Sequence, residues 1–432
     1  MLAYRIVKHN RLKYIMYRIK NWVVSLCGIV LPLVLLASCD SFVKVDNPPE
    51  VIGDEALNGE DKIDFLITGV KARFAEALTD LTVYTGGLSD EQFFDSDVPT
   101  ATGAGAQRTN TGRLQITGGT VGFDETGELR FYADNLLSRI EAISFEDQSL
   151  ETRARYVGNL YGGIARYFYG VYYGLEPEQG GGVIDGGPFI PSDEMFDRAV
   201  DKIEDAHDVT NDDYKKRIAN TLIARIHIIE GNYDAARQAA TGGLEEGDEP
   251  LQALYSQEAE NEWYDTAGPG RRRFAANMRF REYVEENPAE ANRIPLEGIE
   301  GLNTDRTYYY QMKYPTPDAP IDFVTWQENA LILAEIAISE GEDQTAKQWI
   351  NKVRSSHDIK PVNGEVDLDL LIEERDKELF AEGHRLYDQR RFDIFHETVI
   401  AFSPANRAGD PMGPWRYFPI PETERSSNPN ID

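Results

Sequence analysis

The sequence has very few cysteines and none of the short motifs that mark common enzymes. Cys27 and Cys39 are its only cysteines in 432 residues, too few for a disulfide framework or a cysteine zinc cluster. It contains no HExxH motif, no Walker-type glycine loop, no nucleophile elbow and no EF-hand loop. We therefore expect no catalytic residue, no metal site and no cofactor, although the acidic loops at 95–97 and 211–213 leave calcium binding open.

Positive charge is also scarce. The chain has 44 lysines and arginines against 74 aspartates and glutamates, a formal net charge of −30. No basic stripe opposes this acidic excess, which disfavours nucleic acid as a partner. The simplest consequence of the acidity is a hydrated, soluble surface. With 41% hydrophobic residues, the chain is otherwise typical of a globular protein.

Long hydrophobic runs are absent except near the amino terminus. One apolar run extends from Trp22 to Ser38, after a basic segment. It is short for a membrane span and ends in small residues, which is typical of a signal peptide over residues 1–38. The sequence Leu-Ala-Ser-Cys is similar to the lipobox of bacterial lipoproteins, which implies lipidation of Cys39. An uncleaved anchor helix is the alternative, and either one ties the protein to a membrane.

A polar stretch follows this cysteine. Residues 39–60 contain a double proline and no periodic apolar pattern, so we expect the lipidated cysteine and a short tether there. The folded body is then a single domain over residues 61–432. Met16 is an alternative start to Met1, because an extension before the basic segment is unusual in a signal peptide.

The body is organised around helical hairpins. Between Trp326 and Arg354, apolar residues recur at helical spacing on both sides of Gly341, which predicts two helices joined by a turn. The same pattern occurs 110 residues earlier, around Gly231. Small residues twelve apart with a glycine between them are the tetratricopeptide spacing, and such hairpins stack to bury their apolar faces. We therefore predict a mostly α fold of tetratricopeptide-like hairpins, at about 151–206, 214–245 and 326–395.

Two long irregular segments interrupt this scaffold, at about 84–122 and 249–323. Long loops on a rigid scaffold often hold ligands. Sugar recognition uses aromatic faces together with carboxylates, amides and arginines, so the aromatic and acidic side chains of these segments are candidates for ligand binding. They are Phe93, Phe94, Asp95, Trp263, Tyr264, Tyr308 and Tyr309. Each aromatic side chain alone is more often part of a core, so the prediction concerns the two segments rather than single residues.

Four collinear stretches resemble the SusD/RagB family of outer-membrane nutrient-binding lipoproteins. The most specific is an ER..EL..EG.R..D motif, formed by Glu374, Arg375, Glu378, Leu379, Glu382, Gly383, Arg385 and Asp388. The others are FPIPETERSSNPN at 418–430, the segment 329–354 and the helix pattern at 196–206. Ser89-Asp90-Glu91 is a weaker match. The resemblance spans nearly the whole predicted body, although the chain is short for the family.

The motif itself is interpreted as structural. Its glutamates recur every four residues within a predicted final helix from Asp367 to about Phe395, which favours ion pairs on a helix surface. Catalytic carboxylates are the alternative. Gly383 within that helix indicates the close approach of another backbone, so a bulky residue there should mainly reduce stability.

The resemblance implies a lipid-anchored protein of the outer membrane, facing the cell exterior. Such a protein binds a glycan, or sometimes a peptide, and passes it to a SusC-like TonB-dependent β-barrel without catalysis. Two other functions stay open on the sequence. One is a tetratricopeptide-type lipoprotein scaffold for outer-membrane assembly, which the helical hairpins fit equally. The other is a glycan-cleaving enzyme, which would need two carboxylates about 5–10 Å apart.

Overall fold

The computed structural model describes residues 57–100, 104–117, 121–400 and 408–431. Within the chain, Gly59–Asp432 forms one compact unit. The apolar run at 22–38 and Cys39 lie outside the described residues, so the signal peptide and the lipidation stay predictions. Among the described residues, no helix combines the length and the apolar character that a membrane span requires.

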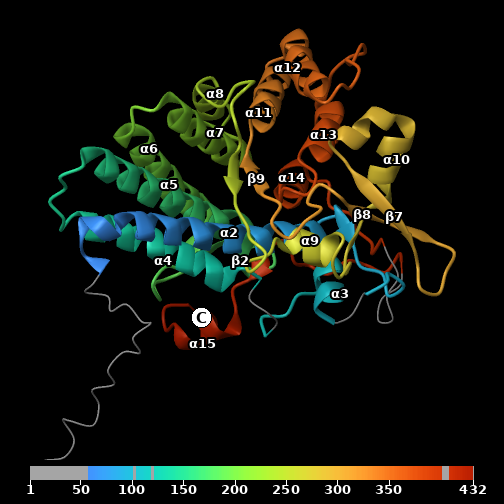
Figure 1. Cartoon of the computed structure of the whole chain (residues 1–432). Coiled ribbons are helices and arrows are strands. Elements are labelled where there is room, and N and C mark those ends of the chain that lie inside the picture. The colour runs from blue at the N-terminus through green and yellow to red at the C-terminus, as the bar shows by residue number, and fades with distance from the viewer. Residues whose placement is uncertain (1–56, 101–103, 118–120, 401–407, 432) are drawn as a thin grey trace, which may run out of the picture. The chain divides into compact units, whose positions relative to one another are not determined.

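Four helices pack side by side around an aromatic core at one end of this unit (Figure 1). They are α2 (Ile63–Leu88), α4 (Phe123–Ile140), α5 (Gln148–Tyr172) and α6 (Ser192–Val209). The ring of Phe74 contacts the ring of Tyr161 edge to face, with 5.0 Å between centroids. At Gly163, an added Cβ would lie 2.9 Å from the carbonyl oxygen of Ala199. Glycine therefore lets α5 and α6 approach closely, which buries their apolar faces.

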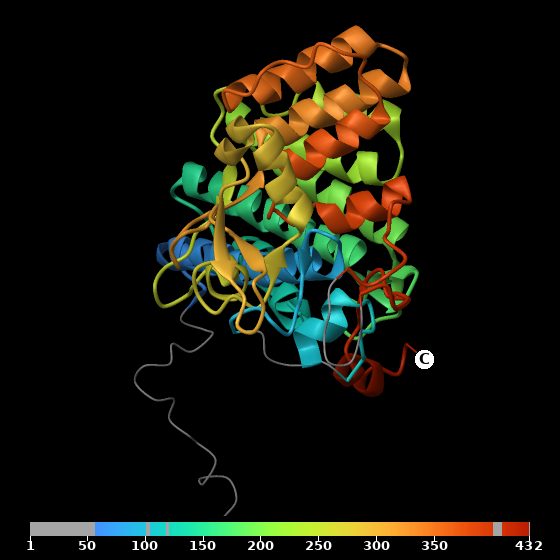
Figure 2. The same cartoon turned by 90° about the vertical axis from the view of Figure 1, so that its right-hand side faces the viewer.

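The two predicted hairpins with the tetratricopeptide spacing are confirmed. They are α7 (Asp213–Ile229) with α8 (Tyr233–Ala240), and α11 (Trp326–Ser339) with α12 (Asp343–Ser356). Gly231 and Gly341 occupy the turns with φ of 74° and 72°, a backbone conformation that glycine adopts without strain. Figures 1 and 2 show α11 and α12 at one end of the unit and α2 and α4 toward the other.

The prediction of one continuous final helix is wrong. The segment forms α13 (Leu368–Glu378) and α14 (Arg385–Phe392), separated by a turn at 379–384. In this turn Ala381 and Gly383 have φ of 63° and 83°. The turn's backbone also bonds to other elements. The Ala381 N–H donates to Glu91 at 3.0 Å, and the Tyr172 hydroxyl donates to the Gly383 carbonyl at 3.3 Å. These tertiary hydrogen bonds replace helical ones.

The remaining elements are short. One sheet has the order β10 (Phe418–Pro419), β2 (Tyr173–Glu176), β3 (Gln179–Gly182) and β4 (Ile190–Pro191), with β10 parallel to β2. Three two-stranded sheets pair β1 (Gln92–Phe93) with β6 (Ala275–Ala276), β5 (Leu251–Ala253) with β9 (Ile321–Val324), and β7 (Leu296–Glu300) with β8 (Thr307–Gln311). The other helices are η2 (Glu60–Lys62), α3 (Ala104–Asn110), α9 (Glu262–Ala267), α10 (Met278–Glu286), η3 (Pro288–Asn292) and α15 (Glu422–Ser427). Most of them lie in the two irregular segments and in the tail.

Candidate ligand-binding face

The two irregular segments meet, although about 180 residues separate them in the sequence. Strand β1 of the early segment pairs with β6 of the long segment, with Gln92 opposite Ala276 and Phe93 opposite Ala275. The Asn277 N–H extends this pairing by donating to the Glu91 carbonyl at 2.9 Å. We call the surface formed by β1, β6 to β8, α9 and α10 the insertion face.

A small core of its own supports the insertion face. Phe93, Val98, Ala275, Tyr308 and Tyr310 pack together, apart from the main core. Side chains alternate across a strand, so in β8 Tyr308 and Tyr310 are buried whereas Tyr309 between them is half-buried on the other side. The alternation explains why adjacent tyrosines have different environments.

The predicted ligand residues divide into buried and accessible side chains. Phe93, Phe94 and Tyr308 are buried, and Trp263 is only 1% exposed. The Trp263 indole N–H donates to the Thr82 hydroxyl at 2.9 Å, which fixes α9 to α2. These four rings anchor the face. Ligand contact stays a prediction, and the half-buried Tyr264 and Tyr309 are the candidates that reach the surface.

Asp95 and Asp97 fasten the tip of the β7–β8 hairpin. The Arg306 guanidinium pairs with the buried Asp95 carboxylate at 2.9 Å. Asp97 accepts hydrogen bonds from the Thr304 hydroxyl and from the backbone and side-chain amides of Asn303, the last two at 3.0 Å. The Thr304 hydrogen bond, followed by those of Asn303, lowers the pKa of Asp97. In the part of the chain that the structure describes, no group of three His, Cys, Asp or Glu side chains is placed to hold a metal ion.

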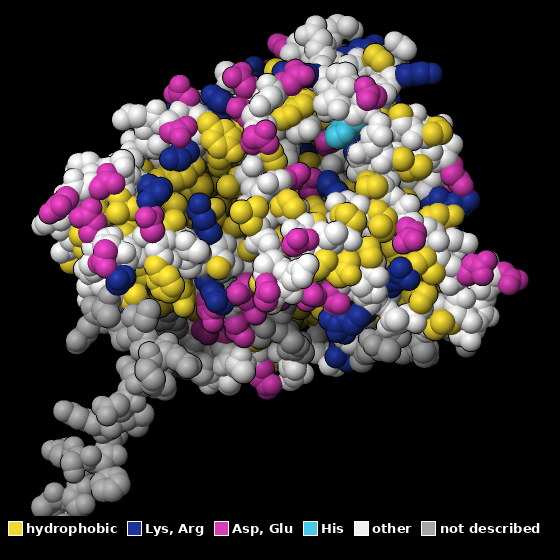
Figure 3. Space-filling model, viewed as in Figure 1, with side chains coloured by type: hydrophobic (Ala, Val, Ile, Leu, Met, Phe, Trp, Pro, Cys, Tyr) yellow, Lys and Arg dark blue, Asp and Glu magenta, His cyan; other side chains and the backbone are white. Residues whose placement is uncertain are grey.

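Arginines accompany the tyrosines of this face. The Arg281 guanidinium lies 5.3 Å from the ring centroid of Tyr309, and Arg272 lies 5.7 Å from that of Tyr310. In the view of Figure 3, hydrophobic side chains gather over the region of α9 and β8, with charged side chains among them. Ring faces beside guanidinium donors suit a ligand with both C–H surfaces and hydroxyls. The sequence shows the basic run 271–273, but nothing in it indicates Arg281, because the stacking depends on tertiary contacts.

The ER..EL..EG.R..D motif lies inside the protein, and the prediction of a helix-surface network is wrong. Arg293, 1% exposed, is bonded by three glutamates: Glu290 at 2.7 Å, Glu374 at 2.8 Å and Glu378 at 3.2 Å. Arg293 and Glu290 belong to the long segment, whereas Glu374 and Glu378 belong to α13. These ion pairs therefore form a buried junction between the long segment and α13. Buried charges are tolerated when each one is paired and hydrogen-bonded.

Other motif residues complete this junction. Arg375 pairs with Asp388 across the turn at 3.0 Å, and Leu379 is buried beside it. Glu382 accepts a hydrogen bond from Lys313 of the long segment at 2.6 Å. Burial raises the pKa of Glu382 to about 7, although the Lys313 charge opposes the change.

The same junction holds the early segment. Arg385 donates two hydrogen bonds to Asp90, at 2.6 and 2.8 Å, and Arg279 joins Asp90 to Asp376. Burial disfavours the charged form of Asp90, but Arg279 and Arg385 outweigh it and lower its pKa to about 2. Ser89-Asp90-Glu91 and the ER..EL..EG.R..D motif are thus two halves of one contact, which fixes both segments of the insertion face to the helical scaffold.

Comparisons with known proteins agree with the fold. Residues 328–432 match the sequence model of the SusD family. The fold matches a SusD superfamily protein from Bacteroides vulgatus with a TM-score of 0.69 and 16% identity, covering 87% of this chain and 98% of that one. The resemblance to the SusD/RagB family is confirmed.

Two further SusD-like structures have names that describe a ligand. A laminarin-binding SusD-like protein matches with a TM-score of 0.66 and 13% identity, over 87% of this chain and 98% of that one. Surface glycan-binding protein A from Bacteroides uniformis matches with a TM-score of 0.68 and 14% identity, over 86% and 99%. A search of curated proteins found no match. At these identities the SusD-like structures establish the fold of the chain and leave its ligand to be argued from the insertion face.

Proposed function

We propose that this protein binds an oligosaccharide on the insertion face and delivers it to a SusC-like TonB-dependent β-barrel. The observation that carries the proposal is the meeting of two distant segments on one face, with Tyr264 and Tyr309 half-buried there. The laminarin-binding and glycan-binding names of two structures with the same fold support a carbohydrate as the ligand. A peptide is the second ligand class.

The chemistry of the face suits binding better than catalysis. Pyranose rings have C–H surfaces that pack on aromatic faces, and their hydroxyls accept hydrogen bonds from guanidinium groups. Arg281 beside Tyr309 supplies both features within one ligand's reach. The carboxylates of this region, Asp95 and Asp97, are already engaged by the hairpin tip. We therefore propose a binding protein and assign no reaction to it.

The proposed location follows from the amino terminus. A lipid on Cys39 would hold the protein on the outer membrane, with the body facing the cell exterior. The tether that follows the cysteine would connect the lipid to the first described helix, η2. Lipid anchoring needs no spanning helix in the body, and the strongly acidic composition disfavours nucleic acid as a partner.

Binding of oligosaccharides by the full chain and by tyrosine variants tests the proposal. We expect Tyr309→Ala and Tyr264→Ala each to weaken binding of the best oligosaccharide in a panel about 2- to 10-fold, since aromatic contacts contribute about 0.5–1.5 kcal/mol. Isothermal titration calorimetry gives the affinities. Phe65→Ala is the matched control, because Phe65 is an exposed aromatic side chain on α2, outside the insertion face.

Two results would count against the proposal. One is an equal loss of affinity in Phe65→Ala and in the two tyrosine variants, which would indicate a general effect on the protein. The other is full affinity in both tyrosine variants, which would place the ligand elsewhere. Thermal unfolding of each variant separates lost binding from lost structure.

A further inference from the structure

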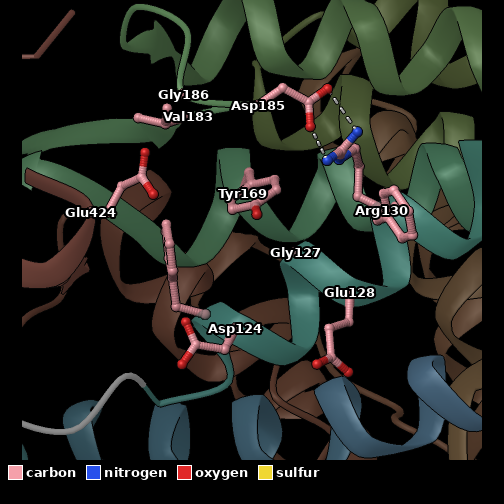
Figure 4. A pocket seen from close by; sticks show the side chains of 11 residues that line it. Asp124, Gly127, Glu128, Arg130, Tyr169, Val183, Asp185, Gly186 and Glu424 are labelled. Atoms are coloured by element: carbon pink, nitrogen blue, oxygen red, sulfur yellow. Dashed lines mark hydrogen bonds and ion pairs between the residues drawn. The ribbon is translucent and has the colours of Figure 1, made fainter. Parts of the chain in front are cut away.

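A hollow lies outside the insertion face. It is a pocket of 350 Å³ between the first turns of α4, the segment after β3 and the last helix, α15 (Figure 4). Its lining combines Asp124 and Gly127 of α4 with Tyr169 of α5, Asp185 after β3, and Glu424 of α15. None of its lining residues belongs to the insertion face. Four segments that are distant in sequence thus build one site.

The pocket has an aromatic wall with a polar atom in it. Tyr169 is 3% exposed and packs edge to face against Phe123, with 5.6 Å between ring centroids. Its hydroxyl lines the pocket and has no hydrogen-bond partner among the residues that the structure describes. At the rim, Phe131 is 54% exposed. An unpartnered hydroxyl on a buried ring is a group that a ligand can satisfy.

Gly127 keeps this wall open. It lies within α4, where glycine is less favourable than alanine by about 1 kcal/mol. A Cβ at this position would lie 3.3 Å from the Tyr169 hydroxyl oxygen, closer than comfortable packing. The glycine therefore leaves the hydroxyl accessible from the pocket at a cost to the helix.

The pocket is negatively charged. Four carboxylates line it against one guanidinium, that of Arg130, and Arg130 is paired with Asp185 at 3.0 Å. Glu128 is paired with Arg73 at 2.8 Å. Asp124 and Glu424 have no basic partner within the described residues, and Glu424 accepts only from the Asn428 amide, at 3.0 Å. Two carboxylates are therefore left to meet a cation, and an anionic ligand would be repelled.

We propose that this pocket binds a protonated primary amine carried on a small polar body. The ammonium group would lie between Asp124 and Glu424, where it meets two carboxylates and the ring of Phe123. The Tyr169 hydroxyl would donate to, or accept from, a hydroxyl of the same ligand. Two sources carry this chemistry, an amino sugar and a lysine side chain. The inference is independent of the proposed glycan site, with which the pocket shares no residue.

Titration of the full chain with matched small probes tests the proposal. D-glucosamine, N-acetyl-D-glucosamine and D-glucose have the same ring but differ in charge, and lysine amide carries the ammonium group on a chain. We expect D-glucosamine or lysine amide to bind at least about tenfold more tightly than the two neutral sugars, because an ammonium–carboxylate contact in a partly enclosed site exceeds a neutral hydrogen bond. The tighter of the two charged probes identifies the source.

Variants that remove the two unpaired carboxylates test whether the charged probe binds in this pocket. Asp124→Asn combined with Glu424→Gln should weaken the charged probe about tenfold or more and leave the neutral sugars unchanged. Glu204→Gln on α6, an exposed carboxylate outside the pocket, should change nothing. Gly127→Ala should also weaken binding while the melting temperature is held or raised. Equal affinity for charged and neutral probes, no binding of either charged probe, or full affinity in the double variant would each overturn the proposal.

Discussion

Gly383 combines a left-handed backbone conformation with close packing against a neighbouring helix. Its φ is 83°, in the left-handed region, and an added Cβ would lie 2.9 Å from Thr82 Cγ2 and 3.3 Å from Thr82 Cα. The sequence interpretation placed this glycine inside a helix, whereas it lies in the turn between α13 and α14. The inferred close approach is nevertheless confirmed, and the neighbouring backbone is that of α2.

Gly383→Ala should therefore reduce stability by more than the cost of placing alanine in a left-handed backbone conformation. Gly341→Ala is the matched control, because Gly341 has φ of 72° but no atom within 4 Å of an added Cβ. We expect about 1 kcal/mol of destabilisation at Gly341 from the left-handed backbone and about 2–4 kcal/mol at Gly383, where overpacking adds to it. Chemical unfolding measures both. Equal losses, or normal unfolding with lost ligand binding at Gly383, would contradict a structural role.

The buried Glu91 carboxyl group should make the free energy of unfolding depend on pH. Burial raises its pKa to about 8, and the Asp376 charge adds to this, although the Ala381 N–H and Arg279 oppose it. A carboxyl whose pKa is raised in the folded state contributes stability below its unfolded pKa of about 4.5, and that contribution is lost as pH rises to about 8. The protein should thus become less stable between pH 5 and pH 8, with Glu91 contributing up to about 1.4 kcal/mol per pH unit.

Glu91→Gln isolates this contribution. The amide keeps an oxygen for the Ala381 N–H but does not titrate, so its curve of unfolding free energy against pH should be flatter over the same window. Glu382, with a pKa raised to about 7, still titrates in the variant and leaves a smaller slope up to about that pH. Parallel curves for the variant and the wild-type protein would show that Glu91 is not the group that titrates.

At the scale of elements, local sequence patterns predict the helical hairpins. The break between α13 and α14 and the orientation of β8 depend instead on tertiary contacts. The α7–α8 and α11–α12 hairpins follow from apolar spacing and turn glycines, which act within one hairpin. The sequence does not indicate the break after Glu378, because the hydrogen-bond partners of the turn's backbone come from the early segment, α5 and the long segment. The sequence does not distinguish Tyr308 from Tyr309, because it does not show which side of β8 faces the small core.

Arg293 tests how strongly the attachment of the long segment depends on its ion pairs with the motif glutamates. Its guanidinium pairs with three buried glutamates, so Arg293→Met would leave Glu290 without its strongest partner and Glu374 and Glu378 under-compensated. We expect a loss of about 3–5 kcal/mol in unfolding free energy, the usual result of breaking a buried ion pair from one side. Chemical denaturation provides the measurement.

The control for this variant is an exposed ion pair. Arg198 pairs with Glu194 on α6 at 2.6 Å, with both side chains well exposed, and Arg198→Met should cost less than about 1 kcal/mol. If Arg293→Met is equally mild, the motif does not stabilise the attachment of the long segment, and its acids would again be open to a role in binding.

At the scale of the whole molecule, the part of the chain that the structure describes is a helical scaffold to which two irregular segments are fastened by buried charges. This arrangement suits a protein that must hold a ligand face in a fixed position relative to a partner, because the face cannot move without breaking paired charges. Under the proposed function, the partner is a β-barrel in the same membrane as the predicted lipid on Cys39.

The partner can be identified by gentle detergent purification of the tagged protein from its own membranes. We expect a stoichiometric TonB-dependent β-barrel to accompany it, and we expect Cys39→Ser to lose both membrane association and the barrel, because the lipid would concentrate the two proteins in one plane. Mass spectrometry identifies the partner and the lipid. Recovery of outer-membrane assembly components instead, or of no partner in several mild detergents, would favour the scaffold function, since a tetratricopeptide-like lipoprotein could serve that role without any ligand face.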